Sequence, residues 1–173
     1  MKRTGLFLFV ITMLTVLVSG CKKDNPVSPI PEISFMDYYK VQYQNSTTDS
    51  LIFLRVRFQD GDGDIGLTLR DTMSPFRIGD RFYNNVFVEY LPGKNGVYNY
   101  QLLGNNDTLN YNDRITNLQP DTRDKSIDGV LTLRISPIIG STVPDSIKFT
   151  VQLADRALHL SNKIAIGPVP VTF

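Results

Sequence analysis

The sequence predicts an all-β fold built as one antiparallel sandwich of seven to eight strands. Short segments in which apolar and polar residues alternate recur along the chain, with turn residues between them. No window of a dozen residues has the 3.6-residue period of a helix. The acids are fifteen Asp against two Glu, and Asp favours turns and strand ends. These features favour a single immunoglobulin-like or fibronectin-III-like β-sandwich, and an open barrel is the alternative fold.

The strands follow one another through residues 33–173, which we expect to form one domain. Arg114–Leu118 is a weak strand, and Asn162–Ile166 and Val169–Phe173 form one final strand bent at Gly167-Pro168. The hairpin signal is Pro92-Gly93-Lys94-Asn95-Gly96. The other predicted strands are Ile33–Tyr43, Leu51–Gln59, Asn85–Leu91, Val97–Leu103, Val130–Ile135 and Ile147–Leu153. The alternation predicts that these side chains face the core: Ile52, Leu54, Val56, Phe58, Leu131, Leu133, Ile135, Ile147, Phe149, Val151 and Leu153.

Composition adjusts this fold prediction. The chain has a single Cys and no Trp, so the disulfide and the core Trp of immunoglobulin domains are absent. Their absence favours the fibronectin-like variant.

The first twenty residues predict a lipoprotein signal peptide. A basic start is followed by the apolar segment Leu6–Val18, which is too short for a comfortable membrane span. Small residues then precede Cys21 in Val18-Ser19-Gly20-Cys21, the pattern of a bacterial lipobox. We therefore expect acylation of Cys21, which becomes the mature N-terminus. More than one acyl chain makes the membrane anchor stable.

The residues after Cys21 indicate a tether and a destination. Asn25–Glu32 holds three prolines, so residues 21–32 are expected to form a stiff tether. The position after Cys21 is not Asp, so the inner-membrane retention signal is missing and the outer membrane is expected. The stretch Lys22-Lys23-Asp24-Asn25 is similar to the charged signal that sends Bacteroidota lipoproteins to the cell surface. Without residues 1–20 the net charge is −1, which leaves no basic field for nucleic acid.

The stretch that suggests chemistry is Asp60-Gly-Asp62-Gly-Asp64, directly after an apolar strand. Carboxylates spaced by two in a curled loop can converge on one calcium ion, which takes six to eight oxygens. Asp71 stands at the twelfth position of the loop, but Ile65 stands where an EF-hand needs Gly. The loop is therefore not an EF-hand. Two hypotheses remain: a calcium site that stiffens the loop, or a structural turn whose aspartates cap backbone amides.

A second loop supplies further candidate ligands. If Leu51–Gln59 and Ile147–Leu153 are strands B and F of the sandwich, the loops that follow them emerge at the same end. The second loop begins at Asp155 and ends at Asn162. Both side chains are then expected near the three aspartates, where they complete the ligand set.

The motifs also carry a resemblance. The lipobox, the DGDGDIG loop and the D-R-A-x-x-x-S-N loop together resemble a class of Bacteroidota surface lipoproteins with an immunoglobulin-like or fibronectin-like domain. The resemblance implies location and fold, and it implies no activity.

Four Asp-Ser/Thr-apolar triplets resemble the O-glycosylation signal of exported proteins in the same bacterial group. The hydroxyl residues are Ser50, Thr72, Thr108 and Ser146. The alternative is that the triplets are strand starts, where Asp in a turn is followed by Ser or Thr and an apolar residue.

No catalytic constellation is found, and we expect no enzyme. The chain has one histidine, His159, no GxSxG elbow, and two Glu without Trp for a glycosidase site. The expected role is a non-enzymatic accessory, adhesion or binding module with an unknown protein or glycan partner. The alternative is a glycan-binding lipoprotein of a nutrient-uptake complex, for which exposed tyrosines on the first strand and the hairpin would serve.

Overall fold

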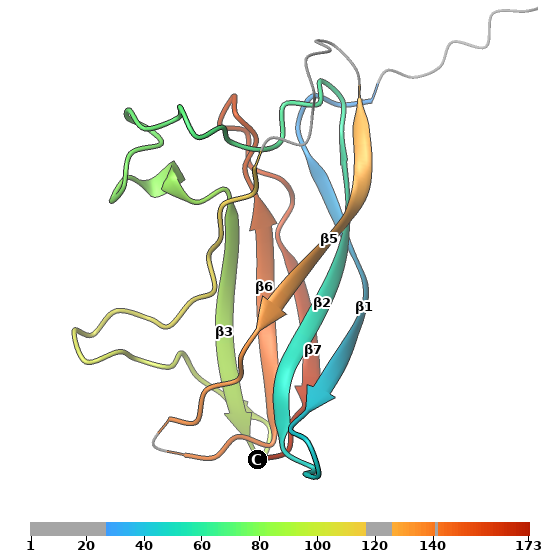
Figure 1. The fold of residues 1–173 in the computed structure, drawn as a ribbon, viewed down its shortest axis with the longest axis vertical. Helices are drawn as coiled ribbons and strands as arrows, with labels where there is room; N and C mark the ends of the chain where they lie inside the picture. The colour runs from blue at the N-terminus through green and yellow to red at the C-terminus, as the bar shows by residue number, and fades with distance from the viewer. Residues whose placement is uncertain (1–26, 117–125, 141) are drawn as a thin grey trace, which may run out of the picture.

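The computed structural model describes residues 27–116, 126–140 and 142–173 and confirms the all-β prediction. Seven strands form two antiparallel sheets, one with the order β1-β2-β5 and one with the order β4-β3-β6-β7 (Figure 1). The strands are β1 (Glu32–Gln42), β2 (Asp49–Asp60), β3 (Val86–Lys94), β4 (Val97–Tyr98), β5 (Ile127–Ile135), β6 (Ser146–Leu153) and β7 (Ile164–Pro170). A single turn of 3-10 helix covers Arg81–Tyr83. No helix in the described part of the chain is long and apolar enough to cross a membrane.

The core lies between the two sheets and is filled by the residues that the alternation predicts. The inward side chains of β2 and β6 are at most 5% exposed, and Leu133 and Ile135 of β5 are buried with them. Leu131 is partly buried against the same cluster. Because inward residues alternate with outward ones, which are polar throughout β6 and in the second half of β2, a one-residue slip would expose the whole set.

The hairpin between β3 and β4 is tighter than the sequence suggests. β3 continues through Pro92 and Gly93 to Lys94, and the turn consists of Asn95 and Gly96, with φ of 50° and 81°. Asn-Gly takes positive φ at both positions, which fits the twist of a two-residue hairpin. Pro92 remains in the strand, where its carbonyl accepts a hydrogen bond from the Asn99 amide.

Two other predicted strands differ from the structure, and the final strand is confirmed. Of the predicted strand Val97–Leu103, only Val97–Tyr98 forms a strand, β4. The prediction of a strand at Arg114–Leu118 is wrong over the described residues 114–116, where Thr116 forms only an isolated bridge to Leu67. The final strand is one strand, β7, with the predicted irregularity at Gly167-Pro168, where its register with β6 shifts. The signal peptide, Cys21 and the first residues of the tether lie outside the described residues.

The end of the tether is part of the folded domain. Ser28 accepts a hydrogen bond of 2.8 Å from the Gly61 amide through its carbonyl, and Pro31 is buried. A Cβ on Gly61 would lie 2.3 Å from the Val27 carbonyl oxygen, so only glycine allows this approach. The chain therefore enters the domain directly beside the DGDGD loop (Figure 1).

Candidate metal centre

The DGDGD loop brings its three aspartates to one point. Asp60 is the last residue of β2, and positive φ at Gly63 (70°) and Gly66 (108°) curls the chain that follows. Ile65 is fully buried and fixes the loop in the core. One carboxylate oxygen each from Asp60, Asp62 and Asp64 lies within 4.8 Å of the other two.

Asp60 is buried and Asp62 and Asp64 are half-buried, and most of their carboxylate oxygens lack a partner in the described part of the chain. Asp60 is 0% exposed, and neither of its oxygens has a hydrogen-bond partner. One oxygen each of Asp62 and Asp64 is also buried and unpartnered. Among the described residues, no Lys or Arg forms an ion pair with any of the three. Buried carboxylates in this state are costly unless a cation is present or a proton is taken up.

The electrostatics lead to the same conclusion. Burial raises the pKa of Asp60 to about 6, and repulsion from Asp62, Asp64 and Asp155 adds to the effect of burial. Burial, then Asp155 and then Asp62, also raise the pKa of Asp64, although amides of the second loop oppose the shift. A cation in this position would remove the repulsion and keep the carboxylates ionised.

The loop after β6 lies against the DGDGD loop, as the strand assignment predicts. The Ala157 amide donates a 3.0 Å hydrogen bond to Asp64 Oδ2. Asp155 is 1% exposed and close enough to raise the pKa values of Asp60 and Asp64. Its own oxygens accept from the backbone amide of His159 at 2.7 Å and lie 2.8 Å from His159 Nδ1. Asp155 therefore lies beside the three aspartates, but both of its carboxylate oxygens already contact His159.

Two predicted ligands have other partners. Asp71 accepts hydrogen bonds from the amide and hydroxyl of Thr68 through one oxygen, and Arg156 binds the other oxygen at 2.6 Å. The Asn162 amide accepts from the Ile33 amide and donates to the Ile33 carbonyl, both at 2.8 Å. The ligand set that the geometry supports is therefore Asp60, Asp62 and Asp64, with Asp155 beside them.

Arg114 has a structural role that the sequence did not reveal. Its guanidinium donates to the carbonyls of Tyr83 at 2.6 Å, Asp71 at 2.8 Å and Thr68 at 3.3 Å, and it lies over the Tyr83 ring. One side chain thus holds the ends of the long connection between the DGDGD loop and β3. The planar, five-donor guanidinium is suited to this, and a lysine is not.

The four predicted glycosylation residues fall into two groups. Thr72 and Thr108 are exposed on loops. Ser50 and Ser146 lie in β2 and β6, where the hydroxyl of Ser50 donates to the Val41 carbonyl and that of Ser146 bonds Asp145 and Tyr98. Modification remains a prediction for all four, and the geometry favours the two threonines.

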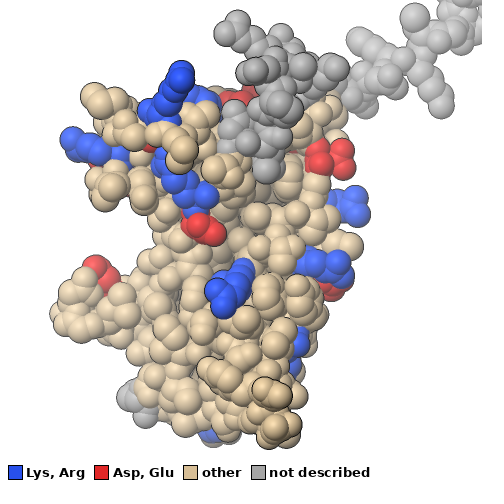
Figure 2. Space-filling model, in the orientation of Figure 1, with Lys and Arg blue, Asp and Glu red and all other residues tan. Residues whose placement is uncertain are grey.

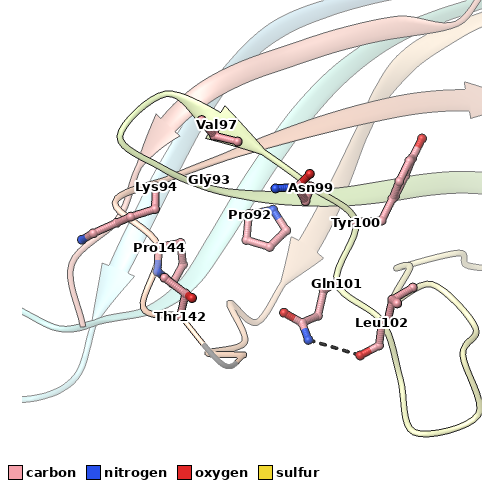
Figure 3. A pocket seen from close by; sticks show the side chains of 10 residues that line it. All are labelled: Pro92, Gly93, Lys94, Val97, Asn99, Tyr100, Gln101, Leu102, Thr142 and Pro144. Carbon is pink, nitrogen blue, oxygen red and sulfur yellow. Dashed lines mark hydrogen bonds between the residues drawn. The ribbon is translucent and has the colours of Figure 1, made fainter.

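A cavity of about 540 Å³ opens at the opposite end of the sandwich. Figure 3 shows Asn99 and Gln101 beside Pro92, with Tyr100 at one side and Lys94 at the other. Tyr100 is 49% exposed. The Gln101 amide donates to the Leu102 carbonyl, which fixes the side chain at the cavity wall. Aromatic and amide groups at one opening are the groups that carbohydrate recognition uses.

The predicted tyrosine faces are only partly exposed. Tyr38, Tyr39 and Tyr43 of the first strand region are exposed, and Tyr39 stacks on Phe53 at 4.7 Å. Tyr90 is fully buried in the core, where its hydroxyl donates to the Ile138 carbonyl. The exposed tyrosines of the hairpin end are therefore reduced to Tyr100, with Tyr98 half-buried.

In comparisons with protein-family models, curated proteins and solved structures, the chain has no match.

Proposed function

We propose that this protein is a lipid-anchored, surface-facing outer-membrane module that binds a partner without catalysis and is stiffened by calcium. The observation that carries the proposal is the set of four buried carboxylate oxygens without partners on Asp60, Asp62 and Asp64. A turn whose aspartates cap backbone amides would have these oxygens hydrogen-bonded. Among the described residues, one hydrogen bond of normal geometry reaches the three side chains, from the Ala157 amide to Asp64, and only weaker contacts from the Asp64 and Arg156 amides add to it.

Calcium fits the donor set better than other cations. The candidate donors are all hard oxygens, and no thiol or imidazole lies among the three aspartates. Calcium accepts flexible geometry and a large coordination number, which waters and nearby carbonyls can complete. Magnesium demands near-ideal octahedral geometry, which a curled loop supplies less readily.

The ion's proposed role is mechanical. The DGDGD loop connects the end of β2 with the loop after β6, through the Asp64–Ala157 hydrogen bond, and with the tether, through the Gly61–Ser28 hydrogen bond. Neutralising the repulsion between its three aspartates would stiffen the joint at which the membrane tether meets the sandwich. A partner that binds elsewhere on the domain, for example at the cavity of the opposite end, would then be held at a fixed orientation to the tether.

The proposed lipid anchor is supported by the lipobox and by the resemblance to surface lipoproteins. Mass spectrometry of the native protein should find acyl chains on Cys21 and no residues before it. Protease treatment of intact cells should remove the domain if it faces outward, whereas an unprocessed or periplasmic protein would contradict the proposal.

Calcium binding can be measured directly by calorimetry on the mature chain with Cys21→Ser. We expect binding to the unmodified loop, loss of binding in Asp62→Asn, and weaker binding of magnesium. Asp128→Asn is the matched control, because Asp128 is exposed on β5 and pairs in register with Gln59 at the same end. Absence of heat with millimolar calcium would contradict the metal site.

Glycan binding at the cavity of the opposite end is a second candidate function. The exposed ring of Tyr100 can stack on a sugar face, and the amides of Asn99 and Gln101 can bind hydroxyls. Affinity on a glycan panel that Tyr100→Ala abolishes and Tyr43→Ala leaves intact would support it. A panel without any binding would leave a protein partner as the expected ligand.

A further inference from the structure

The connection between the DGDGD loop and β3 exposes three large apolar side chains to solvent almost completely. We call residues 68–84 the overhang loop, because it projects sideways from the end of the sandwich (Figure 1). Leu69 is 91% exposed, Met73 77% and Ile78 78%. These are the three most exposed large apolar side chains among the described residues. Three such side chains on one loop indicate an apolar contact outside the domain.

The loop is held in place rather than being a loose excursion. Arg114 binds the carbonyls of Thr68, Asp71 and Tyr83, and Arg156 pairs with Asp71 at 2.6 Å. The exposed side chains therefore project from a loop whose backbone is held by hydrogen bonds and an ion pair. Their exposure is a property of the folded domain.

The overhang loop lies at the end of the domain that the tether reaches, which limits the partners that can cover its apolar side chains. The tether reaches the domain at Gly61, at the same end from which the overhang loop projects (Figure 1). Between Cys21 and Val27 the chain has six residue steps, which span at most about 21 Å when fully extended. With an acyl anchor on Cys21, this end of the domain therefore stays close to the bilayer surface. This step rests on the proposed function.

The charge of the loop suits a bilayer. Arg70, Arg77 and Arg81 are exposed, and Figure 2 shows blue side chains gathered over this part of the molecule. Both acids of the loop are in ion pairs, Asp71 with Arg156 and Asp80 with Arg77. Apolar side chains flanked by arginines are the composition of segments that lie in an anionic membrane interface.

We propose that the overhang loop docks on the anionic bilayer that carries the chain's own anchor, with Leu69, Met73 and Ile78 at the boundary between headgroups and acyl chains. The domain then contacts the membrane at two points, the acylated Cys21 and this loop. The cavity lined by Tyr100 lies at the opposite end of the sandwich and faces away from the bilayer.

The test places an environment-sensitive fluorophore on Met73→Cys of the acylated protein, in vesicles of phosphatidylethanolamine and phosphatidylglycerol. Acylation leaves the new cysteine as the only thiol. We expect a blue-shifted emission that spin-labelled lipids quench. Val97→Cys is the control, because Val97 is 64% exposed at the opposite end, and its probe should report water. Equal, water-like spectra from both probes would overturn the proposal.

A second measurement is independent of lipidation. The mature chain with Cys21→Ser should sediment with phosphatidylglycerol vesicles and not with phosphatidylcholine vesicles. Each Arg→Gln change at 70, 77 or 81 should weaken this binding about fivefold. The combined Leu69→Ser, Met73→Ser and Ile78→Ser variant should lose it, with an unchanged unfolding midpoint. If mass spectrometry finds Cys21 unacylated, the proposed anchor fails. If the Cys21→Ser chain does not sediment with phosphatidylglycerol vesicles, or if the triple variant sediments as well as that chain, the docking proposal fails.

Discussion

Strand β2 begins and ends at a buried aspartate, and the two carboxylates differ in their partners. Asp49 is 2% exposed, and its Oδ2 accepts from Lys40 Nζ at 2.7 Å and from the Thr172 amide at 2.9 Å. Asp60 is 0% exposed, and neither oxygen has a partner. The first carboxylate has a cation supplied by the chain. The second has two further aspartates beside it and no cation among the described residues.

The comparison shows what a buried carboxylate needs. At Asp49 a lysine on the neighbouring strand compensates the charge, although the other Asp49 oxygen is buried without a hydrogen bond. Near Asp60, Arg156 of the second loop pairs with Asp71 instead. Asp60 thus has no cationic partner in the described part of the chain, which is the physical reason to expect an ion from solution.

The largest effect is expected where the chain supplies its own cation. Lys40→Met removes the partner of Asp49 and leaves a buried charge uncompensated, so the free energy of unfolding should fall by about 3 kcal/mol. Chemical denaturation at neutral pH measures it. Adding Asp49→Asn to Lys40→Met should recover much of the loss, because the charge is then gone. If Lys40→Met alone is neutral, the lysine does not compensate Asp49.

The second largest loss of stability is expected from disrupting the contact between the tether and the DGDGD loop. Gly61→Ala places a methyl group against the backbone of Val27 and Ser28 and breaks the Gly61–Ser28 hydrogen bond. We expect a loss of about 2 kcal/mol. Proteolysis should also become faster within residues 26–31. Gly104→Ala is a fitting control, since no atom lies near its added Cβ, and it should change neither property.

The smallest effect concerns pH in the absence of metal. The pKa of Asp60 is about 6 in the folded protein, above its ordinary value of 3.8, so folding favours the protonated form. The stability that this contributes is present below pH 4 and is lost as the pH rises through 6. In chelator, the unfolding free energy should therefore fall between pH 4 and 7, on the order of 1 kcal/mol.

Asp60→Asn checks this prediction, because it removes the titrating group. The variant should lose most of the decline with pH in chelator. A decline of unchanged size would assign the pH dependence to other groups, such as Asp155 or His159, whose pKa values are also raised.

Periodicity predicted the long strands of both sheets and the place of the candidate site, but not the end of β4 at Tyr98 or the irregular chain at residues 114–116. The inward residues of β2 and β6 are those that alternate in the sequence, and their strand order brings the two following loops together. The three aspartates at alternate positions and their glycines predicted the curled loop. These features depend on local pattern and on the topology of a sandwich, which the sequence reveals.

The partners of individual side chains could not be predicted in this way. Asn162 is a good oxygen ligand by type, but its amide binds the backbone of Ile33, which lies 129 residues away. Asp71 fits the spacing of a ligand, but Thr68 and Arg156 occupy its oxygens. The hydrogen bonds of the Arg114 guanidinium go to backbone carbonyls distributed over residues 68–83, and backbone carbonyls leave no pattern in the sequence.

The most direct test of the cation site is thermal unfolding of the mature Cys21→Ser chain, in calcium at about 10 mM and in chelator. Binding at a hundredfold the dissociation constant adds about 2.7 kcal/mol, which raises the midpoint by roughly 5–10 °C in a domain of this size. The prediction is a shift of this kind that Asp60→Asn abolishes and Asp128→Asn retains. Superimposable curves for the unmodified chain in calcium and in chelator would contradict the site and make the DGDGD loop a structural turn.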